Sequence, residues 1–317
     1  MLRKAVKFFA VSIAVLVFAI CFKLTGKSIS FPFFKEKIEQ THSKKTDNKL
    51  SNFDYGNIQF VSKNIQMKPN AICSNVADII KRGELVVCAL NHQNKFFQMQ
   101  TKNVYVGEDI RFASTLGKAL GVNVLYKMIY QTYGDVVEAI HNGEGDVGIA
   151  ELSYTPERAR KVAYSESYVN SRQLILINRI ATVNKDGNTL SKLLNTPEAK
   201  IAVMKNTSYE NYAKMLFPRA QILSDSEWEN GVVKKLLEGK VVAIIWDEAR
   251  IKPLINANPD LLLRFLPIVL KGEKDPISAI TSNKECSLHV FINKFLENEY
   301  KSLSVKEMLQ LYEDCVK

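Results

Sequence analysis

The chain has 317 residues, of which 46% are hydrophobic and 24% are charged, and it carries a net charge of +10. This length predicts about two domains, and this composition excludes wholesale disorder, a collagen-like fibre and a polytopic membrane protein. Five cysteines are too few for a disulfide scaffold. Ten basic and three acidic side chains lie in residues 1–50, so the rest of the chain is nearly neutral and no nucleic-acid partner is expected.

The N-terminus has the pattern of an export signal. Arg3, Lys4 and Lys7 precede an apolar run over residues 8–22. A basic leader stays in the cytoplasm, so we expect the body to lie in the periplasm. Because no good cleavage site follows, we favour an uncleaved anchor that tethers the chain to the inner membrane. A cleaved signal peptide and a buried helix of a cytosolic domain stay open.

The predicted organisation begins with this segment, residues 1–26. Residues 27–68 are rich in Lys, Ser, Asn and Thr and are expected to form a flexible tether. The body then alternates apolar strands with amphipathic helices. Its first half predicts strands over residues 85–90, 122–128 and 146–152 and helices over 108–120 and 135–142. This alternation predicts a parallel sheet with helices on its faces.

The alternation restarts after an apolar strand over residues 173–178. Strands are expected over residues 201–204, 221–224 and 241–246, helices over 208–216, 227–238 and 248–256, then a strand near 277–281 and a helix near 288–300. We therefore predict an α/β fold of two lobes, each with a mainly parallel sheet flanked by helices. Residues 69–178 and 269–317 are assigned to lobe 1, and residues 179–268 to lobe 2.

The most informative stretch lies between a strand and a predicted helix. Thr155 suits a helix N-cap, Pro156 suits the first helical position, and Arg158 follows in the first turn. Open α/β sheets bind ligands at the carboxyl ends of their strands. A guanidinium at this place suits a carboxylate. The alternative is a surface arginine paired with Glu157 or Glu166.

Four residues of other strand–helix junctions are further candidates. Asp247 ends an apolar strand and is placed to accept hydrogen bonds from an ammonium, or else to cap the following helix. Thr207 and Ser208 are placed to hold an anion, or to act as ordinary caps. Tyr133 offers an aromatic face to the ligand, or belongs to the core.

No feature predicts catalysis, a cofactor or a metal. The chain has no phosphate-binding G-x-x-x-x-G-K-[ST] loop, no G-x-S-x-G and no H-E-x-x-H, and its four histidines are scattered. In an oxidising compartment Cys286 and Cys315 are able to pair, but spacing alone leaves this open. The candidates instead place a cation and an anion at matching strand ends. Such a pair suits the carboxylate and ammonium of an α-amino acid, because burying a zwitterion is costly unless both charges are paired.

Several runs of the sequence resemble the periplasmic amino-acid-binding proteins of ABC importers, the family-3 solute-binding proteins. The resemblance covers residues 79–87, 105–122, 133–169, 200–214 and 236–249, and its most specific part is the Thr-Pro-Glu-Arg run after a strand. It implies a type II periplasmic-binding fold. By position, Arg158 matches the arginine that binds the ligand α-carboxylate, and Ser153 the neighbouring hydroxyl. Thr207 lies in the second-lobe loop that also contacts the carboxylate.

The same resemblance implies that Asp247 holds the α-amino group and that Tyr133 lines the side-chain pocket. The sequence also departs from the family. Glu151 stands where a glycine or another small residue is frequent, and it would either select a basic ligand or block the usual one. In the degenerate loop over residues 91–97, Phe97 or the adjacent Phe96 is the candidate aromatic contact, and Tyr209 replaces a frequent glycine.

The predicted function is therefore capture of an amino acid, polar or cationic, by a monomeric receptor that delivers it to an ABC permease of the inner membrane. Two alternatives on the same fold stay open. One is a periplasmic enzyme similar to cyclohexadienyl dehydratases, with Glu151 as acid or base. The other is a non-catalytic sensor or regulatory module.

Overall fold

A computed structural model describes residues 55–62, 75–91, 96–101, 104–182, 190–284 and 287–316. The predicted anchor at residues 8–22 and the side chains of Cys286 and Cys315 lie outside this part of the chain. Among the helices of the described ranges, none combines the length and the apolar content needed to span a membrane.

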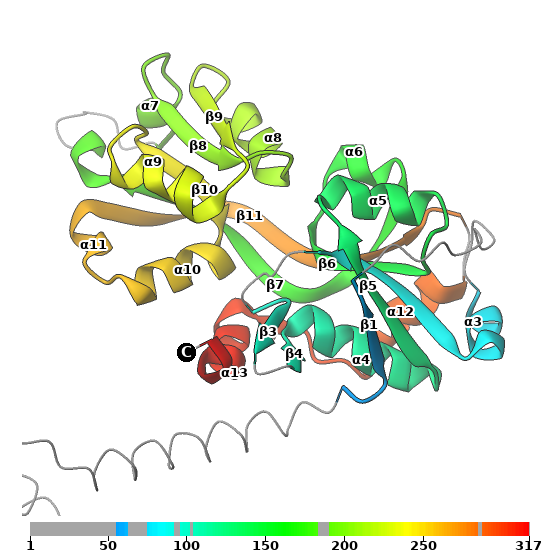
Figure 1. The fold of residues 1–317 in the computed structure, drawn as a ribbon. Helices are drawn as coiled ribbons and strands as arrows, with labels where there is room; N and C mark the ends of the chain where they lie inside the picture. The colour runs from blue at the N-terminus through cyan, green and yellow to red at the C-terminus, as the bar shows by residue number, and fades with distance from the viewer. Residues whose placement is uncertain are drawn as a thin grey trace, which may run out of the picture. The chain divides into compact units, whose positions relative to one another are not determined.

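A single sheet runs through the described body (Figure 1). Its strands follow one another in the order β1 (Ile58–Val61), β5 (Asn123–Tyr130), β2 (Glu84–Leu90), β6 (Val147–Ser153), β11 (Phe265–Ser282), β7 (Val162–Asn178), β10 (Ala243–Asp247), β8 (Lys200–Met204) and β9 (Gln221–Asp225). The first four pair in parallel and form the sheet of lobe 1. The last three pair in parallel and form the sheet of lobe 2.

Helices cover both faces of the lobe 1 sheet, which explains its continuous apolar strands. In β2, Leu85, Val87 and Ala89 belong to one core cluster, whereas Cys88 and Leu90 belong to another. The first cluster contains residues of α3 (Val76–Arg82), α4 (Glu108–Leu120), α12 (Ser287–Asn298) and α13 (Val305–Val316). The second contains residues of α5 (Tyr133–His141). A short helix, α6 (Pro156–Ala159), follows β6.

Lobe 2 has a separate core. Its helical segments are η1 (Arg179–Thr182), α7 (Leu190–Leu194), α8 (Ser208–Leu216), η2 (Trp228–Val233), α9 (Lys234–Leu237), α10 (Glu248–Ala257) and α11 (Leu261–Arg264). The helix expected over residues 227–238 is present, but its first part, η2, is a π-helix. A side chain at Gly231 would collide with the Asp225 carboxyl, so this glycine lets the wide turn pack against β9.

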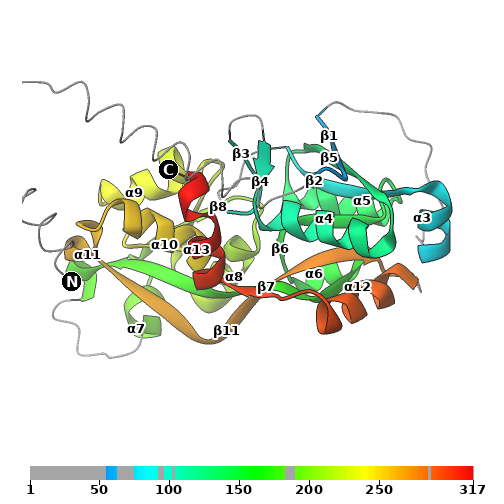
Figure 2. The same cartoon turned by 90° about the horizontal axis from the view of Figure 1, so that it is seen from below.

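Two long strands join the lobes. β7 and β11 pair antiparallel from Asn178 with Phe265 to Val162 with Ser282, and the views of Figures 1 and 2 show them running together from one lobe to the other. The strands predicted over residues 173–178 and 277–281 are parts of these longer ones. A short antiparallel pair, β3 (Met99–Thr101) with β4 (Val104–Val106), and β12 (Leu303–Ser304), beside β7, complete the strands of the described ranges.

The predicted α/β fold, with mainly parallel sheets flanked by helices, is confirmed. The prediction for residues 27–68 is wrong over its described part, residues 55–62, because this segment contains β1. Ile58 and Phe60 pack against the core of lobe 1, and β5 offers its free edge to pair with them. A four-residue strand is too short to stand out in a polar sequence. The exact lobe boundaries stay a prediction.

Candidate functional site

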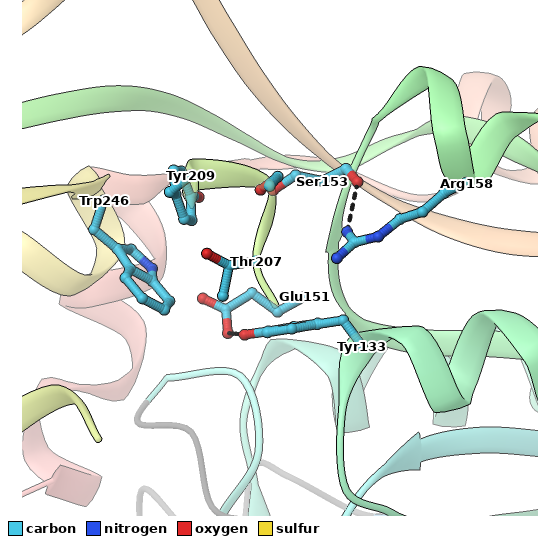
Figure 3. A pocket seen from close by; sticks show the side chains of 8 residues that line it. Tyr133, Glu151, Ser153, Arg158, Thr207, Tyr209 and Trp246 are labelled. Atoms are coloured by element: carbon cyan, nitrogen blue, oxygen red, sulfur yellow. Dashed lines mark hydrogen bonds between the residues drawn. The ribbon is translucent and has the colours of Figure 1, made fainter. Parts of the chain in front are cut away.

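A small cavity lies where strands of the two lobes end (Figure 3). It is lined by Tyr133, Glu151, Ser153 and Arg158 from lobe 1 and by Thr207, Ser208, Tyr209 and Trp246 from lobe 2. Six of the eight residues expected from the sequence are therefore brought together here: Tyr133, Glu151, Ser153, Arg158, Thr207 and Ser208. The remaining two, Asp247 and Phe97, lie elsewhere.

Arg158 is positioned by the junction between β6 and α6. Its backbone N–H donates to the Thr155 hydroxyl at 3.2 Å, which confirms Thr155 as the cap of this helix. Its guanidinium donates to the Ser153 carbonyl at 3.2 Å and lies 5.6 Å from the centre of the Tyr133 ring. Since α6 has only four residues, the guanidinium itself is the positive group of this site. It lines the cavity, so pairing on the surface with Glu157 or Glu166 does not describe it.

Glu151 enters the same cavity from β6. Its Oε2 accepts a hydrogen bond from the Tyr133 hydroxyl at 3.4 Å, visible in Figure 3, and lies 3.9 Å from Nη2 of Arg250. Its buried Oε1 has no hydrogen-bond partner within the described residues. Burial raises the pKa of this carboxyl to about 8, against the effect of Arg250.

The backbone at Glu151 is itself unusual. Its φ is +49°, a left-handed conformation that costs a non-glycine residue free energy. A glycine is the natural residue for this conformation. The Glu151 side chain therefore lies in the cavity although its backbone conformation favours glycine.

Asp247 is not among the residues that line the cavity, and its predicted contact with an ammonium stays a prediction. It is fully buried, its Oδ1 accepts from the N–H of Arg250 at 2.9 Å, and its Oδ2 accepts from the Tyr209 hydroxyl at 3.1 Å. The alternative interpretation, a cap for the next helix, is the one that this geometry matches. Phe97 is likewise not at the cavity, because it is buried in the core of lobe 1.

The Tyr209 hydroxyl connects two of the buried acids. The Tyr209 hydroxyl lies within hydrogen-bond distance of both Asp247 and Asp275. One hydroxyl hydrogen serves only one of these carboxyls, so the other must carry a proton to bond with the phenol oxygen. Burial raises the pKa of both acids, which fits a retained proton.

Aromatic rings close the lobe 2 side. The Trp246 ring lies 4.9 Å from the ring of Tyr209 and 4.9 Å from that of Trp228, measured between centroids. Tyr133, Thr207 and Trp246 also line a neighbouring cleft of about 520 Å³ that is open to solvent. The hydroxyl of Thr207 donates to the Met204 carbonyl at 2.7 Å, so it is held by the end of β8.

Three contributors were missed by sequence reasoning: Trp246, Asp275 and Arg250. Arg250 had a signal, because Asp247-x-x-Arg250 repeats the cap-and-arginine spacing of Thr155-x-x-Arg158. Asp275 had none, since it lies within an extended strand far along the chain. In the described ranges, no group of three His, Cys, Asp or Glu side chains is arranged to hold a metal ion.

The chain is similar to several known proteins. The family model described as bacterial extracellular solute-binding proteins, family 3, matches residues 85–312. Among solved structures, the ancestral cationic amino acid solute binding protein AncCDT-1 is 27% identical with a TM-score of 0.54, over 76% of this chain and 99% of that one. AncCDT-1 is also described as a precursor of cyclohexadienyl dehydratase.

Two further proteins resemble this chain, one in its fold and the other over a part of its sequence. The binding protein AbpA from Streptococcus pneumoniae, bound to L-arginine, is 19% identical with a TM-score of 0.59, over 76% of this chain and 99% of that one. Membrane-bound lytic murein transglycosylase F of Maricaulis maris (strain MCS10) is 28% identical over 135 residues, which is 43% of this chain. The match spans only 28% of the length of that transglycosylase.

Proposed function

Because the chain belongs to the bacterial extracellular solute-binding proteins of family 3, we propose that it captures an amino acid between its lobes and delivers it to an ABC permease of the inner membrane. The type II periplasmic-binding fold expected from the sequence is confirmed by this membership and by the likeness to AncCDT-1. The family is extracytoplasmic. In the proposal the protein works as a monomer in the periplasm, and the apolar run over residues 8–22 tethers it or is removed on export.

One observation carries the proposal: a cation and an acid of lobe 1 face the same small cavity. Arg158 is placed to bind an α-carboxylate, and the unpartnered Oε1 of Glu151 is placed to accept from an α-ammonium. Glu151 takes the role first expected of Asp247, whose oxygens are already bonded. An ammonium beside Glu151 would favour its ionised form, so ligand binding and loss of the carboxyl proton are coupled.

Hydroxyl-bearing side chains of both lobes line the cavity. Ser153 and Thr207 offer hydroxyls beside Arg158 from opposite lobes. A ligand that bonds to both would hold the lobes together, which is how hinged binding proteins close.

A thermal-shift screen of the purified full-length chain with the twenty amino acids and small polyamines tests the proposal. A ligand at 100 times its Kd stabilises the folded state by about 2.7 kcal/mol, so a true ligand gives a clear shift. The Arg158→Ala variant should lose that shift. Absence of any shift with all twenty amino acids would overturn the proposal.

A second candidate function has a specific observation in its favour. Glu151 is buried, and its pKa of about 8 leaves the carboxyl protonated at neutral pH, as a general acid requires. AncCDT-1 is described as a dehydratase precursor. Incubation with prephenate or arogenate separates the two functions: aromatic product that disappears in Glu151→Gln supports an enzyme, and no product supports binding alone. A sensor role would instead show as ligand binding without association with the candidate permease.

A further inference from the structure

The cleft contains a second arginine that the proposed function leaves unused. Arg250 belongs to the first turn of α10 in lobe 2 and lines the larger cleft beside the cavity. Its side chain is only 17% exposed. Its guanidinium carbon lies 5.6 Å from the centre of the Trp246 ring. A buried guanidinium is costly unless its N–H groups and its charge find partners.

Two neighbouring N–H donors lack a hydrogen-bond acceptor within the described residues. Nε of Arg250 and Nε1 of Trp246 are both buried, and neither has a hydrogen-bond partner within the described residues. Both side chains line the same cleft. A buried N–H group without an acceptor costs about 1–3 kcal/mol, so two of them side by side indicate an acceptor that binds here.

The acidic side chains around Arg250 do not hydrogen-bond to its Nε. Asp247 accepts from the backbone N–H of Arg250 and from Tyr209, so its oxygens are engaged. Glu151 forms an ion pair with Nη2 at 3.9 Å, beyond hydrogen-bond distance, and Nε stays without an acceptor within the described residues. Glu229 is the third acid whose charge acts on the guanidinium, and it lies on the wall of the open cleft.

We propose that Arg250 and Trp246 form a second anion-binding subsite, and that the ligand is an α-amino acid whose side chain carries an oxyanion, with L-glutamate as the simplest case. This inference rests on the proposed function, in which Arg158 holds the α-carboxylate. The subsites adjoin each other, because Tyr133, Thr207 and Trp246 line both cavities. A guanidinium binds a carboxylate bidentately, whereas a cationic side chain would meet like charge there.

The test compares three ligands on the purified full-length chain by calorimetry. L-Glutamate and L-glutamine have the same size but differ in charge, and L-lysine carries the opposite charge. We expect glutamate to bind roughly tenfold to a hundredfold more tightly than glutamine, and lysine more weakly than both.

Two variants assign the preference to the subsite. Arg250→Met should remove most of the glutamate preference and leave glutamine within about threefold, whereas Lys252→Met, on the same helix but outside the cleft lining, should change neither. Trp246→Phe keeps the ring and removes its donor, so it should weaken glutamate binding several-fold. It provides a second measurement if Arg250→Met does not fold.

Three results would overturn the inference: glutamine binding as tightly as glutamate, lysine binding more tightly than glutamate, or equal weakening of glutamate and glutamine in both variants. If neutral or cationic amino acids bind in an Arg158-dependent way without a preference for glutamate, the proposed function survives and this inference fails. If no amino acid binds, both fail.

Discussion

The two strand–helix junctions at the cleft share one local design and use it differently. In lobe 1, Thr155 caps α6 and accepts from the N–H of Arg158 at 3.2 Å. In lobe 2, Asp247 caps α10 and accepts from the N–H of Arg250 at 2.9 Å. In both, an arginine three residues after the cap points into the space between the lobes. Equal spacing therefore delivers one guanidinium from each side.

The caps themselves differ in charge and surroundings. Thr155 is a neutral cap of a four-residue helix, whereas Asp247 is an acid at the start of a ten-residue helix and is fully buried. A buried acid needs more partners than a hydroxyl, and Tyr209 supplies one. The lobe 2 cap is consequently tied into the core, while the lobe 1 junction is free to present its arginine. A cap and an arginine at the right spacing thus do not by themselves say which of the two binds the ligand.

The largest effect is expected at the lobe 1 junction. Arg158→Ala should weaken binding of any amino acid by about 2–5 kcal/mol, because the α-carboxylate would be buried without its charged partner. Isothermal calorimetry with a ligand from the screen measures it. Arg160→Ala, an exposed arginine two residues along, is the matched control and should bind normally. Unchanged affinity in Arg158→Ala would remove this junction from the binding site.

The caps should differ in what they contribute to stability. Asp247→Ala should lower the free energy of unfolding by about 2–4 kcal/mol, since it removes a cap and leaves the buried Tyr209 hydroxyl short of a partner. Thr155→Ala should cost about 1 kcal/mol. Urea unfolding of the two variants gives the ratio directly. A cost for Asp247→Ala no greater than for Thr155→Ala would contradict the view that the lobe 2 cap is the structural one.

Most of the fold could be predicted from the sequence, since most strands and helices of the two lobes, β1 excepted, carry their own pattern. Apolar runs mark β2 and β6, and Gly121 ends α4 in a left-handed conformation as expected. The length of β7 and β11 was not predictable in the same way. Their register comes from pairing with each other over both lobes, and no local pattern records a partner far along the chain.

The candidate site shows the same difference between residues placed by local sequence patterns and residues placed by long-range pairing. Arg158, Ser153 and Thr207 follow from strand ends and caps, which are local features. Asp275 reaches Tyr209 only because β11 returns beside β7, so a residue 66 positions away in the sequence completes the group of buried acids. Phe97 was expected at the cavity from an ambiguous loop, and core packing decided its place instead.

Glu151 lies between the two junctions. The pH dependence of the free energy of unfolding should show whether its carboxylate is paired with Arg250 of lobe 2 or is free for a ligand held by lobe 1. Its pKa is raised from 4.5 to about 8, so the folded state holds the proton more firmly than the unfolded chain. The resulting stability is complete below pH 4.5 and is lost as the pH rises through 8. Relative to Glu151→Gln, the protein should therefore lose on the order of 1–2 kcal/mol between these values, a part of the full shift because Asp247 and Asp275 titrate with it.

Urea unfolding of both proteins at several pH values measures this difference. An ion pair with Arg250 strong enough to keep Glu151 charged would give the opposite sign, with stability rising from pH 4 upward. That outcome would tie Glu151 to the lobe 2 arginine in the unliganded protein. A free energy of unfolding that falls as the pH rises would mean that the Glu151 carboxyl is available to a ligand held by lobe 1. Arg250 would then bind a different group.

The smallest effect concerns the backbone that holds Glu151. At a φ of +49° a glycine avoids the steric cost that any side chain meets, so Glu151→Gly should be more stable than Glu151→Ala by about 1 kcal/mol. Both variants remove the carboxylate, so both should weaken amino-acid binding by the same amount. Equal stability of the two would mean that the strand relaxes to a right-handed conformation once the carboxylate is gone. In that case the side chain, by its contacts with Tyr133 and the cleft, imposes the backbone conformation, and not the reverse.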